Sequence, residues 1–131
     1  MIDHLSLYTT SYDAAVKFYD AALGALGFVR QRDMVTSWDP AWPTRKMCAY
    51  GPKGRPILWL SEKKEQPTTG HIAFSAKDEA GVNAFYEAAL KNGGKDNGGP
   101  GKREIYHPKY YGAFVLDPDG NNVEAVFHGA A

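Results

Sequence analysis

Two histidines stand at the same place in two copies of one sequence pattern. The first copy, HLSLYTTSYDAAVKFYDAAL, begins at His4, and the second, HIAFSAKDEAGVNAFYEAAL, begins at His71. The copies keep a constant spacing of 67 residues as far as Leu23 and Leu90. A repeat of this kind predicts two similar structural units. If a two-fold axis relates the units, His4 and His71 face each other across it.

A carboxylate occurs late in the second copy and has no counterpart in the first. The turns predicted at 52–54 and 118–120, each followed by an apolar strand, lie 66 residues apart. In this alignment Glu124 corresponds to Leu58. Glu124 lies within Val-Glu-Ala-Val, and a buried carboxylate there needs a partner because unpaired burial of a charge is costly.

The alternation of side chains along strands predicts that His4, His71 and Glu124 project from one helix-free, concave face. Two imidazoles and one carboxylate form a three-ligand site with open positions, suited to one divalent ion: Zn²⁺, Ni²⁺, Mn²⁺ or Fe²⁺. The competing interpretation is that each histidine is a hydrogen-bonded core residue. His128 lies four residues beyond Glu124, about 13 Å along a strand, and is not expected to join the site.

The elements that must position these residues follow the same order in both halves: strand, helix, three strands. The class is α+β, with two tandem βαβββ modules forming an open, cup-shaped mixed sheet with helices outside. A single domain over 1–131 is expected, made of modules 1–61 and 70–128 joined by linker 62–69. The segment 103–110 is ambiguous between strand and loop.

Bulk properties narrow the classes of function. The chain has 131 residues, a net charge of zero and a single cysteine, Cys48. The balanced charge argues against nucleic acid and anionic membrane as partners. The absence of a signal-like N-terminus and of a long apolar run predicts a cytoplasmic protein. Cys48 is expected to be a small core residue rather than a nucleophile.

Further polar and aromatic residues are candidates for acid–base chemistry or substrate contacts. Tyr106, His107 and Tyr110 precede a predicted strand and could supply acids, bases or hydrogen-bond donors alongside Glu124. The substrate-binding candidates are Trp38, Trp42, Arg45, Arg103 and Lys109. The alternative for the loop residues is a polar rim, and for the tryptophans a plug at the open end of the sheet. The glycine-rich stretch 97–101 is a candidate mobile lid.

These motifs resemble the vicinal oxygen chelate superfamily, which includes glyoxalases, bleomycin-resistance proteins and extradiol dioxygenases. The resemblance covers essentially the whole chain and rests on four stretches: Ile2–Leu5, Phe18-Tyr19, Gly70–Phe74, and Phe114–Glu124 with its Asp-Pro-Asp-Gly turn. It implies two βαβββ modules around a metal held by His4, His71 and Glu124. It also implies a homodimer and a small-molecule substrate.

The resemblance leaves three functions open. The first is a metal-dependent enzyme of the glyoxalase or dioxygenase type, a lyase, isomerase or dioxygenase that binds a small oxygenated substrate through two adjacent oxygens. The second is a metal-free protein that binds a drug or metabolite, as bleomycin-resistance proteins do. The third is a fosfomycin-type thiol transferase. Leu58 departs from the glyoxalase I pattern, in which a second carboxylate is usual at the equivalent position.

Overall fold

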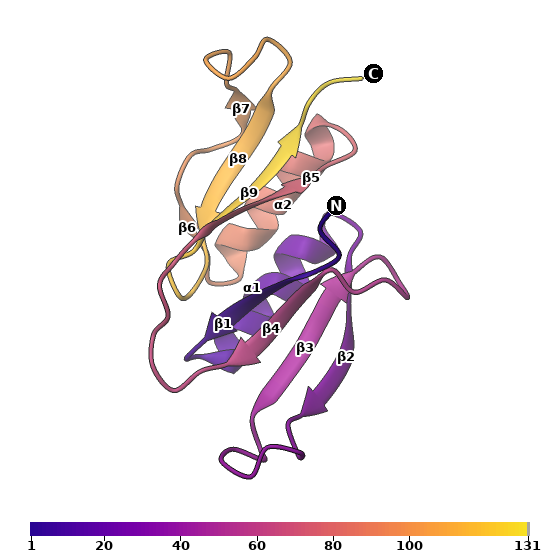
Figure 1. The fold of residues 1–131 in the computed structure, drawn as a ribbon. Helices are drawn as coiled ribbons and strands as arrows, with labels where there is room; N and C mark the ends of the chain where they lie inside the picture. Colours follow the sequence, from indigo (N-terminus) through magenta and orange to yellow (C-terminus); the bar gives the residue numbers. More distant parts are fainter. Residues whose placement is uncertain (131) are drawn as a thin grey trace.

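The computed structural model describes residues 1–130 as two βαβββ-like modules that lie side by side (Figure 1). The first module contains β1 (Leu5–Thr9), α1 (Tyr12–Gly24), β2 (Val29–Val35), β3 (Lys46–Gly51) and β4 (Leu58–Glu62). The second contains β5 (His71–Ser75), α2 (Glu79–Lys91), β6 (Lys95–Asp96), β7 (Gly101–Lys102), β8 (Tyr111–Leu116) and β9 (Asn122–Phe127).

Each module has its own mixed sheet. The strand orders are β1-β4-β3-β2 and β5-β9-β8-β6, and β7 also pairs with β8. The β1–β4 and β5–β9 pairs are parallel and the remaining pairs are antiparallel. The predicted fold class is therefore confirmed: tandem modules with unclosed, mixed sheets.

Two details differ from the expectation. The sheets are separate, because β1 and β5 end their sheets at the junction between the modules without pairing to each other (Figure 1). In the second module the chain between α2 and β8 forms two short strands, β6 and β7, which lie before the segment 103–110 for which a strand was left open. The intervening Asn97–Pro100 segment is irregular, and Gly98 has a φ of 135°, which a residue with a side chain rarely adopts. The segment 103–110, ambiguous from the sequence, consists of turns.

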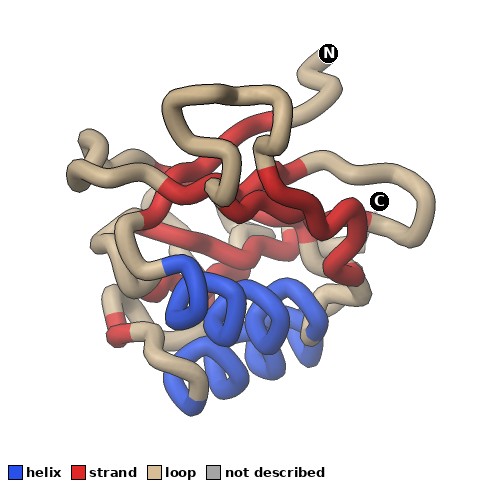
Figure 2. Tube along the Cα trace, turned by 90° about the horizontal axis from the view of Figure 1, so that it is seen from below, coloured by secondary structure: helices blue, strands red, loops and turns tan. Residues whose placement is uncertain are grey.

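The two helices cover one side of the sheets, and Figure 2 shows them together below the strands. In α2, the Asp78 side chain accepts a hydrogen bond of 2.7 Å from the backbone N–H of Gly81, a regular N-cap. In α1, Ser11 is the N-cap residue but its side chain makes no cap bond. The helix ends at Gly24, and Gly27 follows with a φ of 87°.

The core runs through both modules, so the helices and sheets form one packed unit. Fully buried residues include Phe18 and Leu23 from α1 and Phe85 from α2. At the junction, the rings of Phe28 and Phe74 lie 5.8 Å apart, edge to face. Within residues 1–130, no helix is long and apolar enough to cross a membrane.

The junction also contains a buried hydrogen bond between the modules. The Tyr19 hydroxyl of α1 donates to Asp117, which follows β8, at 2.5 Å. Asp117 also accepts from the backbone N–H groups of Asp119 and Asn121 and from the Asn121 side chain. Burial and the adjacent Asp117 charge raise the pKa of Tyr19 well above its ordinary value, so the phenol remains a donor.

Candidate metal centre and ligand cavity

The structure brings two of the three expected metal ligands together. His71 begins β5, and Glu124 lies in the neighbouring parallel strand β9, with 3.1 Å between His71 Nε2 and Glu124 Oε1. The second carboxylate oxygen accepts a short hydrogen bond from the Tyr110 hydroxyl. Glu124 is 2% exposed, whereas the His71 side chain is 47% exposed. A buried carboxylate therefore meets a solvent-facing imidazole.

The protonation pattern of His71 fits a metal ligand. Its Nδ1 lies 2.9 Å from the backbone oxygen of Asn122, which can only accept, so Nδ1 carries a proton. In a neutral ring Nε2 then presents a lone pair towards Glu124. Metal-binding histidines are usually oriented in this way, by a hydrogen bond from the ring nitrogen that does not bind the metal to a backbone carbonyl or a carboxylate.

The spacing of the two donor atoms also fits. Two ligand atoms each about 2.1 Å from one ion and about 95° apart are about 3.1 Å from each other. The observed separation between His71 Nε2 and Glu124 Oε1 is 3.1 Å. A cation, or a shared proton, would remove the repulsion between a lone pair and a carboxylate at this distance. The pair is therefore suited to a divalent ion.

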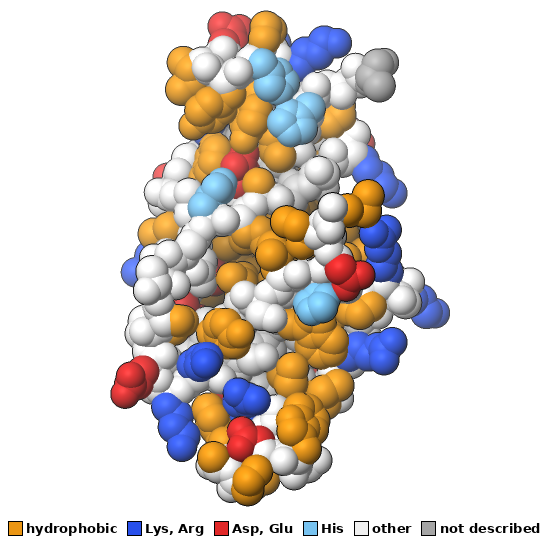
Figure 3. Space-filling model, viewed as in Figure 1, with side chains coloured by type: hydrophobic (Ala, Val, Ile, Leu, Met, Phe, Trp, Pro, Cys, Tyr) orange, Lys and Arg blue, Asp and Glu red, His pale blue; other side chains and the backbone are white. Residues whose placement is uncertain are grey.

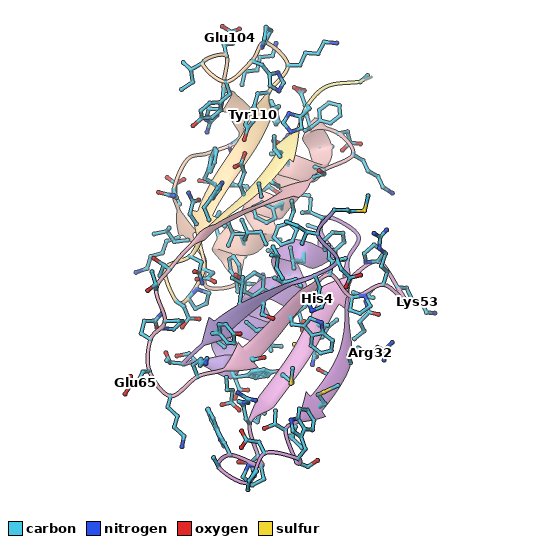
Figure 4. The ribbon with its side chains drawn as sticks, in the orientation of Figure 1. His4, Arg32, Lys53, Glu65, Glu104 and Tyr110 are labelled. Carbon is cyan, nitrogen blue, oxygen red and sulfur yellow. The ribbon has the colours of Figure 1, made fainter. Side chains whose placement is uncertain are left out.

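His4 lies elsewhere on the same chain. It precedes β1, and its Nδ1 is 2.7 Å from Asp3 Oδ1. It lines a cavity of 370 Å³ at the junction of the modules, whereas His71 and Glu124 line a different one. Figure 4 shows His4 over the first module and Tyr110 over the second. Within residues 1–130, no three His, Cys, Asp or Glu side chains converge as a metal site.

The histidines nevertheless share one surface. Figure 3 shows pale-blue histidine side chains over both modules on the face turned away from the helices. The His4 side chain is 53% exposed, similar to His71. Both imidazoles are thus open to a ligand or to another molecule approaching this face.

The strand register identifies a different counterpart for Glu124. Leu5 pairs with Leu58 and Ser6 with Trp59 in the first module, as Ile72 pairs with Val123 and Ala73 with Glu124 in the second. Trp59, not Leu58, is therefore the equivalent of Glu124. Leu58 is 1% exposed and belongs to the core, as Val123 does.

The assignment of Leu58 to the position equivalent to Glu124 was therefore wrong. The first module carries its Pro-x-Gly turn one residue earlier relative to the strand pair, so aligning the turns shifts the strand by one residue. A shift of one residue moves every side chain to the other face. The departure from a four-ligand pattern remains, with an indole in place of the carboxylate.

The His71–Glu124 pair opens into a cavity of 500 Å³ in the second module. Its other walls are Tyr106, Tyr110, Phe114 and Asn122. The Phe114 ring stacks on His71 with 6.2 Å between centroids, and Tyr106 packs edge-on against Tyr110 at 4.9 Å. Sequence reasoning missed Phe114 and Asn122, although both face the cavity from the strands beside the predicted ligands.

Two predicted acid–base candidates, Tyr106 and Tyr110, thus lie in this cavity. Burial and the neighbouring Glu124 carboxylate raise the pKa of Tyr110 above that of a free phenol. Tyr110 therefore acts as a hydrogen-bond donor at neutral pH and not as a base.

His107 lies behind Tyr110 and does not line the cavity. Its Nε2 is 2.8 Å from His128 Nδ1, and its Nδ1 accepts from the backbone N–H of Lys109. Both imidazole rings pack edge-on against Tyr110. His107 and His128 therefore support the position of the Tyr110 ring.

The remaining substrate-binding candidates divide into two groups. Arg103 borders a second cavity of 280 Å³ that shares Tyr106, Phe114 and Asn122 with the first. Lys109 is exposed and lines neither cavity.

The connection between β2 and β3, at the far end of the first module (Figure 1), carries the other three candidates: Trp38, Trp42 and Arg45. Trp38 is 66% exposed, and the Trp42 ring lies 5.1 Å from Lys64 Nζ. The structure thus separates these three residues from the His71–Glu124 cavity. Cys48 is fully buried in β3, as the sequence predicted.

Comparison with known proteins places this arrangement in context. The family model described as the glyoxalase/bleomycin resistance protein/dioxygenase superfamily matches residues 1–125. A search of curated protein sequences gives no match.

Among solved structures, a glyoxalase/bleomycin resistance protein from Albidiferax ferrireducens T118 is 26% identical, with a TM-score of 0.69 over 98% of this chain and 99% of that one. A variant of glyoxalase I from Zea mays is 21% identical, with a TM-score of 0.71 over 99% of this chain and 45% of that one. A glyoxalase-related enzyme from Fulvimarina pelagi is 16% identical, with a TM-score of 0.66 over 97% and 87%. The last two likenesses concern the fold alone.

Proposed function

Because the chain belongs to the glyoxalase/bleomycin resistance protein/dioxygenase superfamily, we propose that it is a metal-dependent enzyme acting on a small oxygenated molecule. The observation that carries the proposal is the pairing of His71 Nε2 with the buried Glu124 carboxylate at 3.1 Å, beside an open cavity. One divalent ion, with Zn²⁺, Ni²⁺, Mn²⁺ and Fe²⁺ as candidates, would be held by His71, Glu124 and a His4 side chain.

We infer that the third ligand comes from a second copy of the chain. His4 and the His71–Glu124 pair line separate cavities, yet both imidazoles are about half exposed on the same face. Among residues 1–130, no strand pairs with the outer edge of β1, next to His4, or of β5, which begins at His71. A homodimer in which β1 of each chain pairs with β5 of the other would give two complete sites.

The bound ion would supply Lewis acidity towards two adjacent oxygens of the substrate. Glu124 is fixed by the Tyr110 hydroxyl, and His71 by the Asn122 backbone oxygen, so both ligands are pre-oriented. Phe114 and Tyr106 line one side of the cavity with aromatic rings. Tyr110, which remains protonated, holds a donor proton at the edge of the site.

The second candidate function is metal-free binding of a drug or metabolite. One observation favours it: the position equivalent to Glu124 in the first module is Trp59, so a second carboxylate is missing there. A binding protein would have use for an indole on this face and no need for a fourth ligand.

Elemental analysis of the purified protein distinguishes the metal-dependent enzyme from the metal-free binding protein. The enzyme proposal expects about one equivalent of a divalent metal per chain, lost in His4→Ala, His71→Ala and Glu124→Ala. Glu87→Ala, at an exposed position of α2, should keep its metal. If the wild type binds no divalent ion even after reconstitution, the enzyme proposal fails and ligand binding becomes the better account.

Mixing two inactive variants tests the shared site. A dimer formed from one His4→Ala chain and one His71→Ala chain has one intact site if each site uses both chains, and none if each site lies within one chain. Recovery of about half of the wild-type metal content in the purified mixed dimer would support the shared site. No recovery would refute it.

A further inference from the structure

Beside the His71–Glu124 cavity lies a second lobe that the proposed metal chemistry does not use. Its volume is 280 Å³, and it is bordered by Asn97, Gly98 and Arg103 together with three residues common to both lobes: Tyr106, Phe114 and Asn122. The two lobes therefore share part of their walls.

Arg103 brings a positive charge without a counter-ion to this lobe. Among residues 1–130 its guanidinium pairs with no carboxylate, and Nη2 donates to the backbone oxygen of Gly99 at 2.7 Å. Its Cζ lies 5.5 Å from the Phe114 centroid, the same ring that stacks on His71. This stacking and the Gly99 contact hold the guanidinium at the lobe while leaving donors free.

Asn122 supplies an unfilled acceptor at the boundary of the two lobes. Its side-chain oxygen is buried and has no hydrogen-bond partner among the described residues. Buried polar atoms without partners are rare in native proteins and are often satisfied by a bound molecule or ion. Because this oxygen accepts only, the group that satisfies it must carry an O–H or N–H donor.

We propose that the Arg103 lobe is an anion subsite that selects small hydroxycarboxylates. The carboxylate would pair with the Arg103 guanidinium and a hydroxyl would donate to Asn122 Oδ1, with Phe114 and Tyr106 covering the apolar part. The inference rests on the proposed function in one respect: the adjoining His71–Glu124 cavity is the one in which the substrate oxygens would meet the metal ligands. The anion subsite itself needs no metal, so it can be tested separately.

The test is calorimetric titration of the metal-free protein, treated with chelator, using mandelate as the probe. Its neutral counterpart 1-phenyl-1,2-ethanediol and inorganic phosphate serve as comparison ligands. Wild type is expected to bind mandelate at least about tenfold more tightly than the diol, since a charged hydrogen bond contributes about 1.5 kcal/mol or more. Phosphate binding tighter than mandelate would overturn the assignment to hydroxycarboxylates.

Two variants test whether the preference for mandelate over the diol comes from the Arg103 lobe. Arg103→Gln should lose the preference for mandelate over the diol. Lys102→Gln, which removes the same charge from the exposed neighbouring residue, should keep it. Equal mandelate affinity in Arg103→Gln and wild type would overturn the proposal.

Because the Gly99 contact could make Arg103→Gln fold poorly, the Nε–Hε resonance of Arg103 in the wild type gives a second readout. Mandelate, and not the diol, should shift it, and an unmoved resonance at saturation would also overturn the proposal.

Repeating the titration with Ni²⁺ or Zn²⁺ separates this inference from the proposed function. Arg103-dependent mandelate binding in a protein that never binds metal would leave the anion subsite standing and remove the enzyme proposal. Mandelate binding that needs metal and is unchanged in Arg103→Gln would overturn the anion subsite and leave the enzyme proposal standing.

Discussion

Replacing Glu124 by glutamine should stabilise the metal-free protein while abolishing its affinity for metal. Glu124 is 2% exposed and faces Nε2 of His71, whose other nitrogen donates to the Asn122 carbonyl. In Glu124→Gln the amide oxygen can still accept from Tyr110, and the amide nitrogen can donate to the His71 lone pair. A repulsive contact between two acceptors thus becomes a hydrogen bond.

The magnitude follows from these two contacts. One net hydrogen bond contributes about 1 kcal/mol, and removing a buried charge that lacks a full complement of partners adds to the gain. We expect the free energy of unfolding of the metal-free protein to rise by about 1 kcal/mol, or the melting temperature by about 3 °C. Metal at 100 times its Kd should stabilise the wild type by about 2.7 kcal/mol and leave Glu124→Gln unchanged.

The assay is urea denaturation with chelator at pH 8.5, where imidazoles are ordinarily neutral, followed by the same measurement with Ni²⁺ or Zn²⁺. Glu87→Gln, at an exposed position of α2, is the matched control and should change neither result. A loss of about 3 kcal/mol or more in metal-free Glu124→Gln would refute the reasoning, because it would show that the carboxylate is already fully paired within the fold.

Three further outcomes test the fold directly by urea denaturation. Asp78→Ala should lower the free energy of unfolding by about 1 kcal/mol because it removes the α2 cap; Ser11→Ala, whose side chain makes no cap bond, should have little effect, and equal losses would contradict the capping argument. Tyr19→Phe should cost about 1.5–3 kcal/mol because its hydroxyl bonds a buried carboxylate. Tyr86→Phe, the repeat-equivalent change at an exposed Asp96 contact, should cost less than about 0.5 kcal/mol, and the reverse order would contradict the role of the junction. Burial raises the pKa of the Cys48 thiol, so its contribution to stability is complete below the ordinary cysteine pKa of about 8.5 and declines as the pH rises above it. Between pH 7 and 9.5 the wild type should lose more stability than Cys48→Ala, and parallel losses would contradict this account.

The repeat, the helices and the contact between His71 and Glu124 could be predicted because each rests on local pattern. The parity of alternating strands was sufficient to predict that His71 and Glu124 meet, since both lie in adjacent parallel strands. The Asp78 cap follows from residue type and position.

What could not be predicted depends on register and on the arrangement of the modules. Aligning the turns of the two copies gave Leu58 as the counterpart of Glu124, whereas the hydrogen-bonded ladders give Trp59. The distance between His4 and His71 depends on how the two sheets lie relative to each other, and alternation within one strand says nothing about that. The unfilled Asn122 acceptor likewise emerges only from the packing around it.

The free edges of β1 and β5 carry a consequence for assembly. Among the described residues, each sheet has one end strand at the junction, β1 or β5, besides its other end strand, β2 or β6. Reciprocal pairing of β1 and β5 between two chains uses these edges of both chains and closes, so this contact adds no third chain. One-sided pairing leaves one edge open at either end and can add chains without limit, as any non-closing head-to-tail contact does. In the proposed homodimer, substitutions that disturb reciprocal closure would therefore favour a filament over a closed pair, even where each chain folds normally.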